Sequence, residues 1–190
     1  MTNTRYIALL RGINVGGHNV KMDALRALFT ELGFVQVCSF IQSGNLFFET
    51  VETDRVALRK TIEQHLESSL GYTVPTCLRT LAESATILQR DPFKAISLTP
   101  ETRFAVTLLP QPTAVELPLP YLTPDGGYEL IDQTPSELFV VWHLKNSRPA
   151  GSYGLIEKKV QTQGTTRFWH TFADIVAAAK GKEHPNPPIT

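Results

Sequence analysis

Apolar residues recur along the first 80 residues in two patterns, which predict short strands and longer helices. Short apolar runs have the length of strands, whereas apolar residues spaced three and four apart predict helices over residues 22–32 and 54–70. Glycine follows each predicted helix, at Gly33 and Gly71, where a helix C-terminus is expected. The predicted strands are Arg5–Leu10, Val35–Ile41, Leu46–Glu49 and Val74–Arg79.

The order of these elements predicts the topology of the N-terminal domain. Ser43-Gly44-Asn45 is a tight-turn signal, so the second and third strands form a hairpin. The resulting order is β-α-β-β-α-β, the split βαβ or ferredoxin-like pattern. Right-handed crossovers then give the antiparallel strand order 4-1-3-2.

The second half predicts a smaller α+β arrangement packed against the first domain. Strands are expected at Arg103–Leu109, Tyr128–Ile131 and Leu138–Leu144, and a helix near Leu155–Val160. A last helix carries Trp169 and Phe172 on one face, with Thr165 or Thr166 as its N-cap. We therefore expect an α+β fold with a ferredoxin-like domain (1–80), a connecting helix and linker (81–100), an α+β C-terminal domain (101–180) and a mobile tail (181–190).

The predicted central strands are apolar on consecutive positions. Tyr6–Leu10 and Leu46–Phe48 lack the alternation expected of a sheet with helices on one face only. The second face is therefore expected to be covered as well. The cover could be the C-terminal half, a second subunit or stacked bases.

Charge and composition exclude several classes of protein. The 18 Lys and Arg balance the 18 Asp and Glu, which argues against a general polyanion binder. Neither a signal peptide nor an apolar stretch of roughly 20 residues is evident, so a soluble, cytoplasmic protein is expected. The two cysteines, Cys38 and Cys77, and the five scattered histidines predict no metal site. The oligomeric state is left open.

Two polar segments are predicted to meet at one end of the first sheet. In the 4-1-3-2 order, the loop Arg11–Gly17 and the turn Gln42–Asn45 lie at the same edge. The loop also leads into a helix N-terminus, whose free N–H groups favour an anion. His18 and Lys21 could add charge. We predict a small ligand bearing phosphate or carboxylate, held by Arg11, Asn14, Gly16, Gly17, Gln42, Ser43 and Asn45, with Arg167 closing the site from the C-terminal half.

Three alternatives remain open. The glycines and amides could serve loop and turn structure alone. The sheet could instead bind nucleic acid through Tyr6 and Phe47 or Phe48, which is less favoured because aromatic residues in central strands are mostly core. An interaction protein without a small ligand is the third. Whether the protein is an enzyme is undecided: His170 and Asp174 could pair on a helix, but no general base, nucleophile or cofactor is assigned.

Three motifs resemble the DUF1697 family, a group of mostly bacterial proteins without an assigned function. They are Ala8–Gly17 (ALLRGINVGG), Leu28–Phe34 (LFTELGF) and Ile41–Asn45 (IQSGN). The resemblance is specific over roughly the first 80 residues, thins through the proline-rich middle and returns at Thr165–Thr171.

The resemblance implies an α+β protein and groups the first two polar motifs with Thr166, Arg167 and Thr171. The family pattern at Thr165–Thr171 reads Thr-Thr-Arg-Asn-Trp-Asn-Thr, whereas this chain has Phe168 and His170 in place of the two asparagines. A family site that used those amides is altered here. The segment before it is also shorter than in the family pattern. The resemblance implies no catalytic residue, cofactor or substrate.

Overall fold

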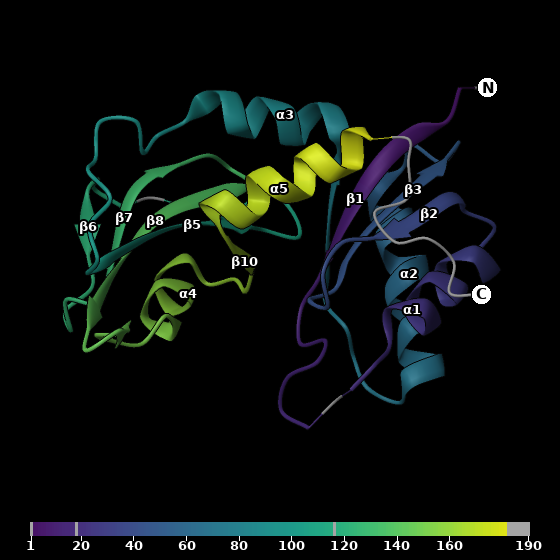
Figure 1. Cartoon of the computed structure of the whole chain (residues 1–190), viewed down its shortest axis with the longest axis horizontal. Coiled ribbons are helices and arrows are strands. Elements are labelled where there is room, and N and C mark those ends of the chain that lie inside the picture. The colour runs from purple at the N-terminus through teal and green to yellow at the C-terminus, as the bar shows by residue number, and fades with distance from the viewer. Residues whose placement is uncertain (1, 18, 116, 182–190) are drawn as a thin grey trace. The chain divides into compact units, whose positions relative to one another are not determined.

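The computed structural model describes residues 2–17, 19–115 and 117–181 of the chain. These residues form an α+β structure with five helices and two antiparallel sheets. The chain divides into two compact units: the first extends to Ile87 and resumes at Asp174, and the second spans Leu88–Ala173. Each unit contains one of the sheets (Figure 1).

The first unit has the predicted element order and strand order. Its sheet runs β2-β3-β1-β4 with antiparallel pairing throughout. Helices α1 and α2 lie on the same side of this sheet (Figure 1). The elements are β1 (Thr4–Leu10), α1 (Met22–Glu31), β2 (Val35–Ser39), β3 (Asn45–Thr50), α2 (Arg55–Leu70) and β4 (Thr76–Thr80).

Helix α2 shows how local sequence sets these boundaries. The Asp54 carboxylate accepts hydrogen bonds from the amides of Val56 (2.9 Å) and Ala57 (3.1 Å), which caps the first turn. Gly71 ends the helix in a left-handed conformation (φ 81°), which glycine adopts without steric cost. Both signals are local, so the helix length follows from the sequence.

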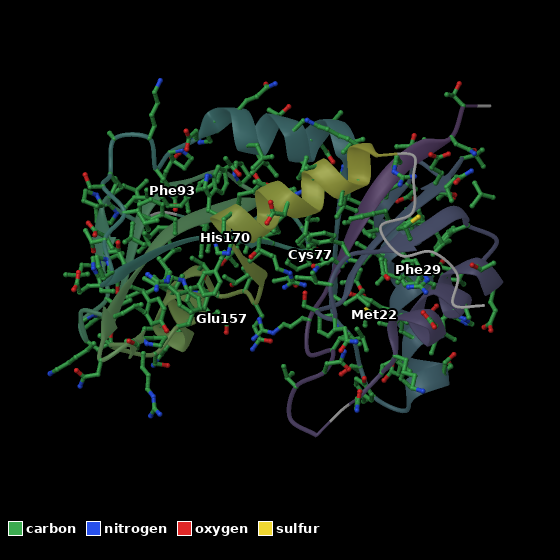
Figure 2. The ribbon with its side chains drawn as sticks, viewed as in Figure 1. Met22, Phe29, Cys77, Phe93, Glu157 and His170 are labelled. Carbon is green, nitrogen blue, oxygen red and sulfur yellow. The ribbon has the colours of Figure 1, made fainter. Side chains whose placement is uncertain are left out.

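An aromatic cluster forms the core between the helices and the sheet. Phe29 of α1 (labelled in Figure 2) packs edge-on against Phe48 of β3, and the ring centroids are 5.4 Å apart. Tyr6 stacks on Phe48 from the neighbouring strand at 5.7 Å. Tyr6 and Phe48 are 3% and 0% exposed, and Phe47 on the opposite face is also buried, so none of these rings is available to a nucleic-acid base.

The second face of this sheet is buried too, as the continuous hydrophobicity predicted. Ile7, Leu9 and Phe47 on that face are completely buried. The last turns of α5 (Trp169–Lys180) belong to this unit, and Arg5 Nε donates to the Ala179 carbonyl at 2.8 Å. The C-terminal helix therefore contributes to a unit formed mainly by the first 87 residues.

The second unit is a mostly meandering antiparallel sheet with an additional edge strand. Its strand order is β10-β5-β8-β7-β6, and β9 pairs with β8. Helix α3 (Leu81–Arg90) leads into it from the first unit. The other elements are β5 (Thr102–Leu108), β6 (Tyr121–Leu122), β7 (Tyr128–Gln133), β8 (Glu137–Lys145), β9 (Arg148–Pro149), α4 (Gly154–Val160) and β10 (Thr165–Phe168).

Apolar groups cover both faces of this second sheet. On one face, Ile156 and Val160 of α4 join a core that includes Tyr128 and Val140. On the other face, Phe93 (labelled in Figure 2) stacks on Phe104, and the ring centroids are 4.6 Å apart. Among its described residues, the proline-rich stretch before β7 contains only the two-residue strand β6, in line with the prediction that no long element fits there.

The expectation that Thr165 or Thr166 caps the last helix is wrong. Both residues belong to β10, which pairs with β5, so that Thr166 lies opposite Thr107. Their hydroxyl oxygens are 2.8 Å apart. A partner 59 residues away overrides the local capping signal. The tail predicted over 181–190 lies outside the described residues except for its first residue.

Candidate functional site

The loop after β1 and the β2–β3 turn lie at the same end of the sheet, as predicted. The Leu10 amide donates to the Gly44 carbonyl at 2.8 Å, which joins the end of β1 to the turn. The Arg11 amide donates to the Pro75 carbonyl at 2.9 Å, so the first loop residue is also held by the segment before β4. Two stretches some thirty residues apart in sequence therefore form one surface.

Asn14 connects three parts of this surface. Its Nδ2 donates to the Gln42 carbonyl at 3.3 Å, and its Oδ1 accepts from the Val20 amide at 2.6 Å. The first bond reaches the hairpin turn, and the second holds the approach to α1. Asn14 itself is left-handed (φ 58°), a conformation that asparagine tolerates better than most residues. Because both ends of its amide are occupied, Asn14 positions the loop.

The hairpin turn is stabilised by its own side chains. Asn45 is completely buried, and its Nδ2 donates to the Phe40 carbonyl at 3.2 Å and to Ser43 Oγ at 2.8 Å. Both contacts hold the turn closed. Gln42 has an exposed side chain, so it is the turn residue best placed to contact a ligand.

The glycines of the loop leave its backbone open. Gly16 and Gly17 have φ values of 62° and 92°, which side-chain-bearing residues rarely adopt. A Cβ added to either would meet no atom within 4 Å, so close packing does not explain them. Both are exposed, and their amides can be approached from outside.

The start of α1 carries one positive charge that favours an anion, Lys21, and one negative charge that opposes it, Asp23. Lys21 occupies the N-cap position without a side-chain hydrogen bond to the first turn, and its side chain is exposed. Asp23 adds a negative charge there, which the Arg26 guanidinium pairs directly. Arg26 Nη1 also donates to Ser39 Oγ at 2.7 Å, so this ion pair joins α1 to β2. Of the other predicted cations, Arg11 is half-buried at the end of β1 and His18 lies outside the described residues.

The gap directly between the loop and the turn is filled by aliphatic side chains. A Cβ on Gly44 would lie 3.0 Å from Leu10 Cβ and 3.3 Å from Ile13 Cβ. Ile13 is buried there. A ligand can therefore contact only the outer rim of this surface, formed by Arg11, Gln42 and the glycine backbone.

Arg167, the remaining predicted site residue, lies on β10 in the second unit. Its Nη1 donates to the Thr166 carbonyl at 2.9 Å. The grouping of Arg167 with the first-unit loop stays a prediction. The Phe168 ring packs edge-on against the Trp142 ring, with centroids 5.1 Å apart. The exposed His170 ring lies nearly parallel to the Phe168 ring, with centroids 6.0 Å apart.

Three hydroxyl groups next to Arg167 form a network in the second unit. Thr107 Oγ1 lies within hydrogen-bond distance of both Tyr153 Oη and Thr166 Oγ1. Burial raises the pKa of the Tyr153 hydroxyl to about 12, against the lowering effect of these hydrogen bonds. The Tyr153 hydroxyl is therefore protonated at physiological pH.

A cavity in the second unit was not predicted from the sequence. A cavity of about 220 Å³ is lined by Thr113, Ala114, Val115, Gln133, Thr134 and Pro135. Its two walls come from segments about twenty residues apart, and Gln133 belongs to an ordinary strand pattern.

The described parts of the chain contain neither a cluster of metal-ligating side chains nor a helix that could cross a membrane. No group of three or more His, Cys, Asp or Glu side chains is placed there to hold a metal ion. Among the helices of residues 2–17, 19–115 and 117–181, none has both the length and the hydropathy of a membrane span. Cys38 and Cys77 are buried, and neither forms a disulfide within the described residues.

Comparison with known proteins gives a family and a fold. The sequence model of DUF1697, described as a protein of unknown function, matches residues 3–136. The solved structure of the conserved bacterial protein SP0830 from Streptococcus pneumoniae is similar, with a TM-score of 0.64 and 24% sequence identity. The alignment covers 94% of this chain and 100% of that one. A search of curated proteins gave no match.

Proposed function

Because this chain belongs to the DUF1697 family of proteins of unknown function, we propose its function from the geometry of the loop surface. The protein binds a small anionic ligand, bearing phosphate or carboxylate, on the rim formed by the loop after β1 and the β2–β3 turn. The Arg11 guanidinium supplies the charge, the amides of Gly16 and Gly17 supply donors, and the Gln42 side chain orients the ligand. The cytoplasmic location expected from the sequence belongs to the same proposal.

One observation supports this proposal above the others. The glycine loop is exposed, with no atom near the added Cβ positions of Gly16 and Gly17, yet it is held by the two hydrogen bonds of Asn14. A fixed loop with open backbone donors can bind an anion without first being ordered. Contact with neighbouring atoms therefore does not account for Gly16 and Gly17.

A phosphate titration of the whole chain tests the proposal. The ¹H–¹⁵N spectrum is followed as inorganic phosphate, and separately acetate, is added at constant ionic strength. We expect the amides of Gly12, Gly16 and Gly17 to shift together. Arg11→Ala should weaken phosphate binding by roughly tenfold or more, as a charged hydrogen bond would. Arg148→Ala removes an exposed arginine of the second unit and should change nothing.

A second variant keeps the test valid if Arg11→Ala does not fold. Val15 is 59% exposed beside the two glycines, so Val15→Glu places a negative charge at the rim without touching the core. It should weaken phosphate binding, whereas Val15→Gln should not. Shifts that follow neither Arg11 nor residue 15, or equal losses in the Arg148→Ala control, would show that the loop is purely structural.

A further inference from the structure

We propose that the anion bound at the loop surface also carries an aliphatic group, which contacts the side chains of Val15 and Ile41. The ligand is then a small amphipathic anion, an aliphatic carboxylate or an alkyl phosphate, instead of an inorganic ion. This inference rests on the proposed function and deepens it, because it concerns the same surface. All the residues that carry it belong to the first unit.

Ile41 has a backbone conformation that its side chain disfavours. Its φ is 50°, in the left-handed region, where a branched Cβ crowds the backbone. Glycine and asparagine adopt this conformation at lower cost. Isoleucine is therefore a strained choice for this position of the β2–β3 turn. The other side-chain-bearing residues with a positive φ in the described parts of the chain are all polar: Asn14, Gln36, Asp91, Asn146, Ser147 and Gln161.

The burial of Ile41 does not compensate for this strain. The residue is 49% exposed, whereas Ile7 and Ile62 in the core of the same unit are completely buried. The turn is closed around Ile41 by two hydrogen bonds: the Phe40 amide donates to the Asn45 carbonyl at 3.0 Å, and Asn45 Nδ2 donates to the Phe40 carbonyl at 3.2 Å. Residues held in such conformations by their surroundings cluster at binding and active sites. The fold gains little from this side chain, so we assign it to a ligand.

Val15 is a second exposed aliphatic residue of the same surface. It is 59% exposed and lies between Asn14 and Gly16, which both have a positive φ (58° and 62°). Asn14 Nδ2 donates to the Gln42 carbonyl at 3.3 Å, so the residue before Val15 is bonded to the residue after Ile41. Two segments of the chain thus bring an aliphatic residue each to one surface.

Polar groups lie directly beside both aliphatic residues. Val15 precedes the open backbone of Gly16 and Gly17, and Ile41 precedes the exposed side chain of Gln42. An inorganic anion would use the donors and leave both aliphatic side chains in water. A ligand with an aliphatic group also removes their apolar surface from water, and this gain grows with the area covered. The surface therefore suits a ligand that has both parts.

Acetate, hexanoate and 1-hexanol separate the two parts of such a ligand. Each is titrated into the whole chain at constant ionic strength and followed in ¹H–¹⁵N spectra. Hexanoate should bind roughly tenfold more tightly than acetate, since its longer chain is only partly removed from water on an open surface. It should shift the amides of Val15 and Ile41 together with those of Gly16 and Gly17. Hexanol has the chain without the charge and should shift these amides far less.

Ile41→Asn tests whether Ile41 contacts the aliphatic group. The variant should lose most of the roughly tenfold preference for hexanoate over acetate. Its urea midpoint should rise, because asparagine relieves the left-handed strain. A residue that serves the fold alone would show neither change. Val51→Asn is the matched control: Val51 is 52% exposed in the same unit and has no positive φ, so this variant should keep the wild-type preference. If Ile41→Asn does not fold, the wild-type comparison of hexanoate with acetate still decides.

An aliphatic carboxylate can be a free acid or the C-terminal residue of a peptide, and a further pair of probes distinguishes the two. N-acetylleucine and 4-methylpentanoate share the branched chain and the carboxylate, but only the first has the amide of a peptide. Equal binding of the two points to a peptide C-terminus. A preference for 4-methylpentanoate points to a free acid.

Two results would overturn the inference. One is equal binding of acetate and hexanoate to the wild type, and the other is binding of hexanol as tight as that of hexanoate. Either result leaves the proposed function intact, since inorganic phosphate has no aliphatic group and its titration reports on Gly12, Gly16 and Gly17 alone. If phosphate, acetate and hexanoate all fail to shift these glycines, the proposed function itself is wrong.

Discussion

Gly17 of the first unit and Gly164 of the second unit occupy opposite environments. Gly17, in the loop after β1, has a positive φ and no atom within 4 Å of an added Cβ. Gly164, before β10, is tightly enclosed, and an added Cβ would lie 2.4 Å from Thr107 Cγ2 and 2.7 Å from the Leu108 carbonyl oxygen. Gly151 resembles Gly164, since its Cβ would lie 2.2 Å from the Asp125 side chain. Glycine is needed at position 17 because of its backbone conformation, and at positions 151 and 164 because neighbouring atoms leave no room for a side chain.

The surface around Gly16 and Gly17 is open to a ligand, whereas the backbone at Gly151 is covered by a side chain of the protein. Around Gly151, the Asp125 carboxylate accepts from Thr123 Oγ1 (2.7 Å), the Gly127 amide (3.1 Å) and the Ser152 amide (2.8 Å). These donors hold the pKa of the Asp125 carboxyl below its usual value. Asp125 thus occupies the kind of position, against glycine backbone, that a ligand anion is proposed to take at Gly16 and Gly17.

The sharpest test of the comparison is alanine substitution at one glycine of each kind. Gly164→Ala should lower the free energy of unfolding by about 3 kcal/mol, because β5 backbone cannot move away from the new Cβ. Gly17→Ala should lower it by only about 1 kcal/mol, the strain of a left-handed alanine. Urea denaturation of both variants measures the difference. A larger loss at Gly17 than at Gly164 would contradict the assignment of the two glycine roles.

The next test concerns how firmly the open loop is held. Asn14→Ala removes both side-chain hydrogen bonds and should cost about 1.5 kcal/mol of stability. Asn14→Asp keeps the acceptor for the Val20 amide and loses only the donor to Gln42, so it should cost about half as much. Asn19→Ala, an exposed neighbour, is the control and should change stability by less than about 0.5 kcal/mol. Equal stability of all three variants would mean that Asn14 does not fix the loop.

The smallest expected effect is a pH dependence confined to the second unit. Hydrogen bonds from Arg90 hold the pKa of Asp132 below its usual value. Because the folded pKa is lowered, the stabilisation is present above the unfolded value of about 3.9 and is lost as pH falls through the folded pKa. The pair is partly exposed, so the effect should stay below about 1 kcal/mol.

The measurement compares denaturant midpoints of the wild type and Asp132→Asn between pH 6 and pH 3. The two curves should approach each other towards the acid end, as the wild-type carboxyl becomes protonated. A constant gap between them at all pH values would show that the Arg90–Asp132 pair makes no charge-dependent contribution. Asp91→Asn, next to Arg90, provides the matched control.

Much of the first unit could be predicted because its signals are local. Asp54 and Gly71 mark the ends of α2, and the Ser43–Asn45 turn pairs adjacent strands. Once these elements were placed, the strand order followed from the handedness of crossovers, and it brought Arg11 and Gln42 to one edge. The prediction that both faces of this sheet are buried also held, since it rested on unbroken hydrophobicity in β1 and β3.

The parts that could not be predicted depend on distant contacts. Strand β10 exists because Thr165–Phe168 pairs with β5, and four residues of mixed character carry no strand signal of their own. The sequence also did not predict that Ile13 packs against Gly44, or that both ends of the Asn14 amide form hydrogen bonds. Both contacts determine where a ligand can lie.

By itself, the sequence determined the strands and helices of the first unit's sheet, where that part of the chain turns, and which polar loops share an edge, because spacing, caps and turn residues act over a few positions. Only the tertiary structure decided which polar atoms have a hydrogen-bond partner and which have none. Gln133 illustrates this: its Nε2 donates to the Val115 carbonyl 18 residues away, and its Oε1 has no partner among the described residues. Such pairings arise when the chain packs, since hydrogen-bond partners are set by proximity in space.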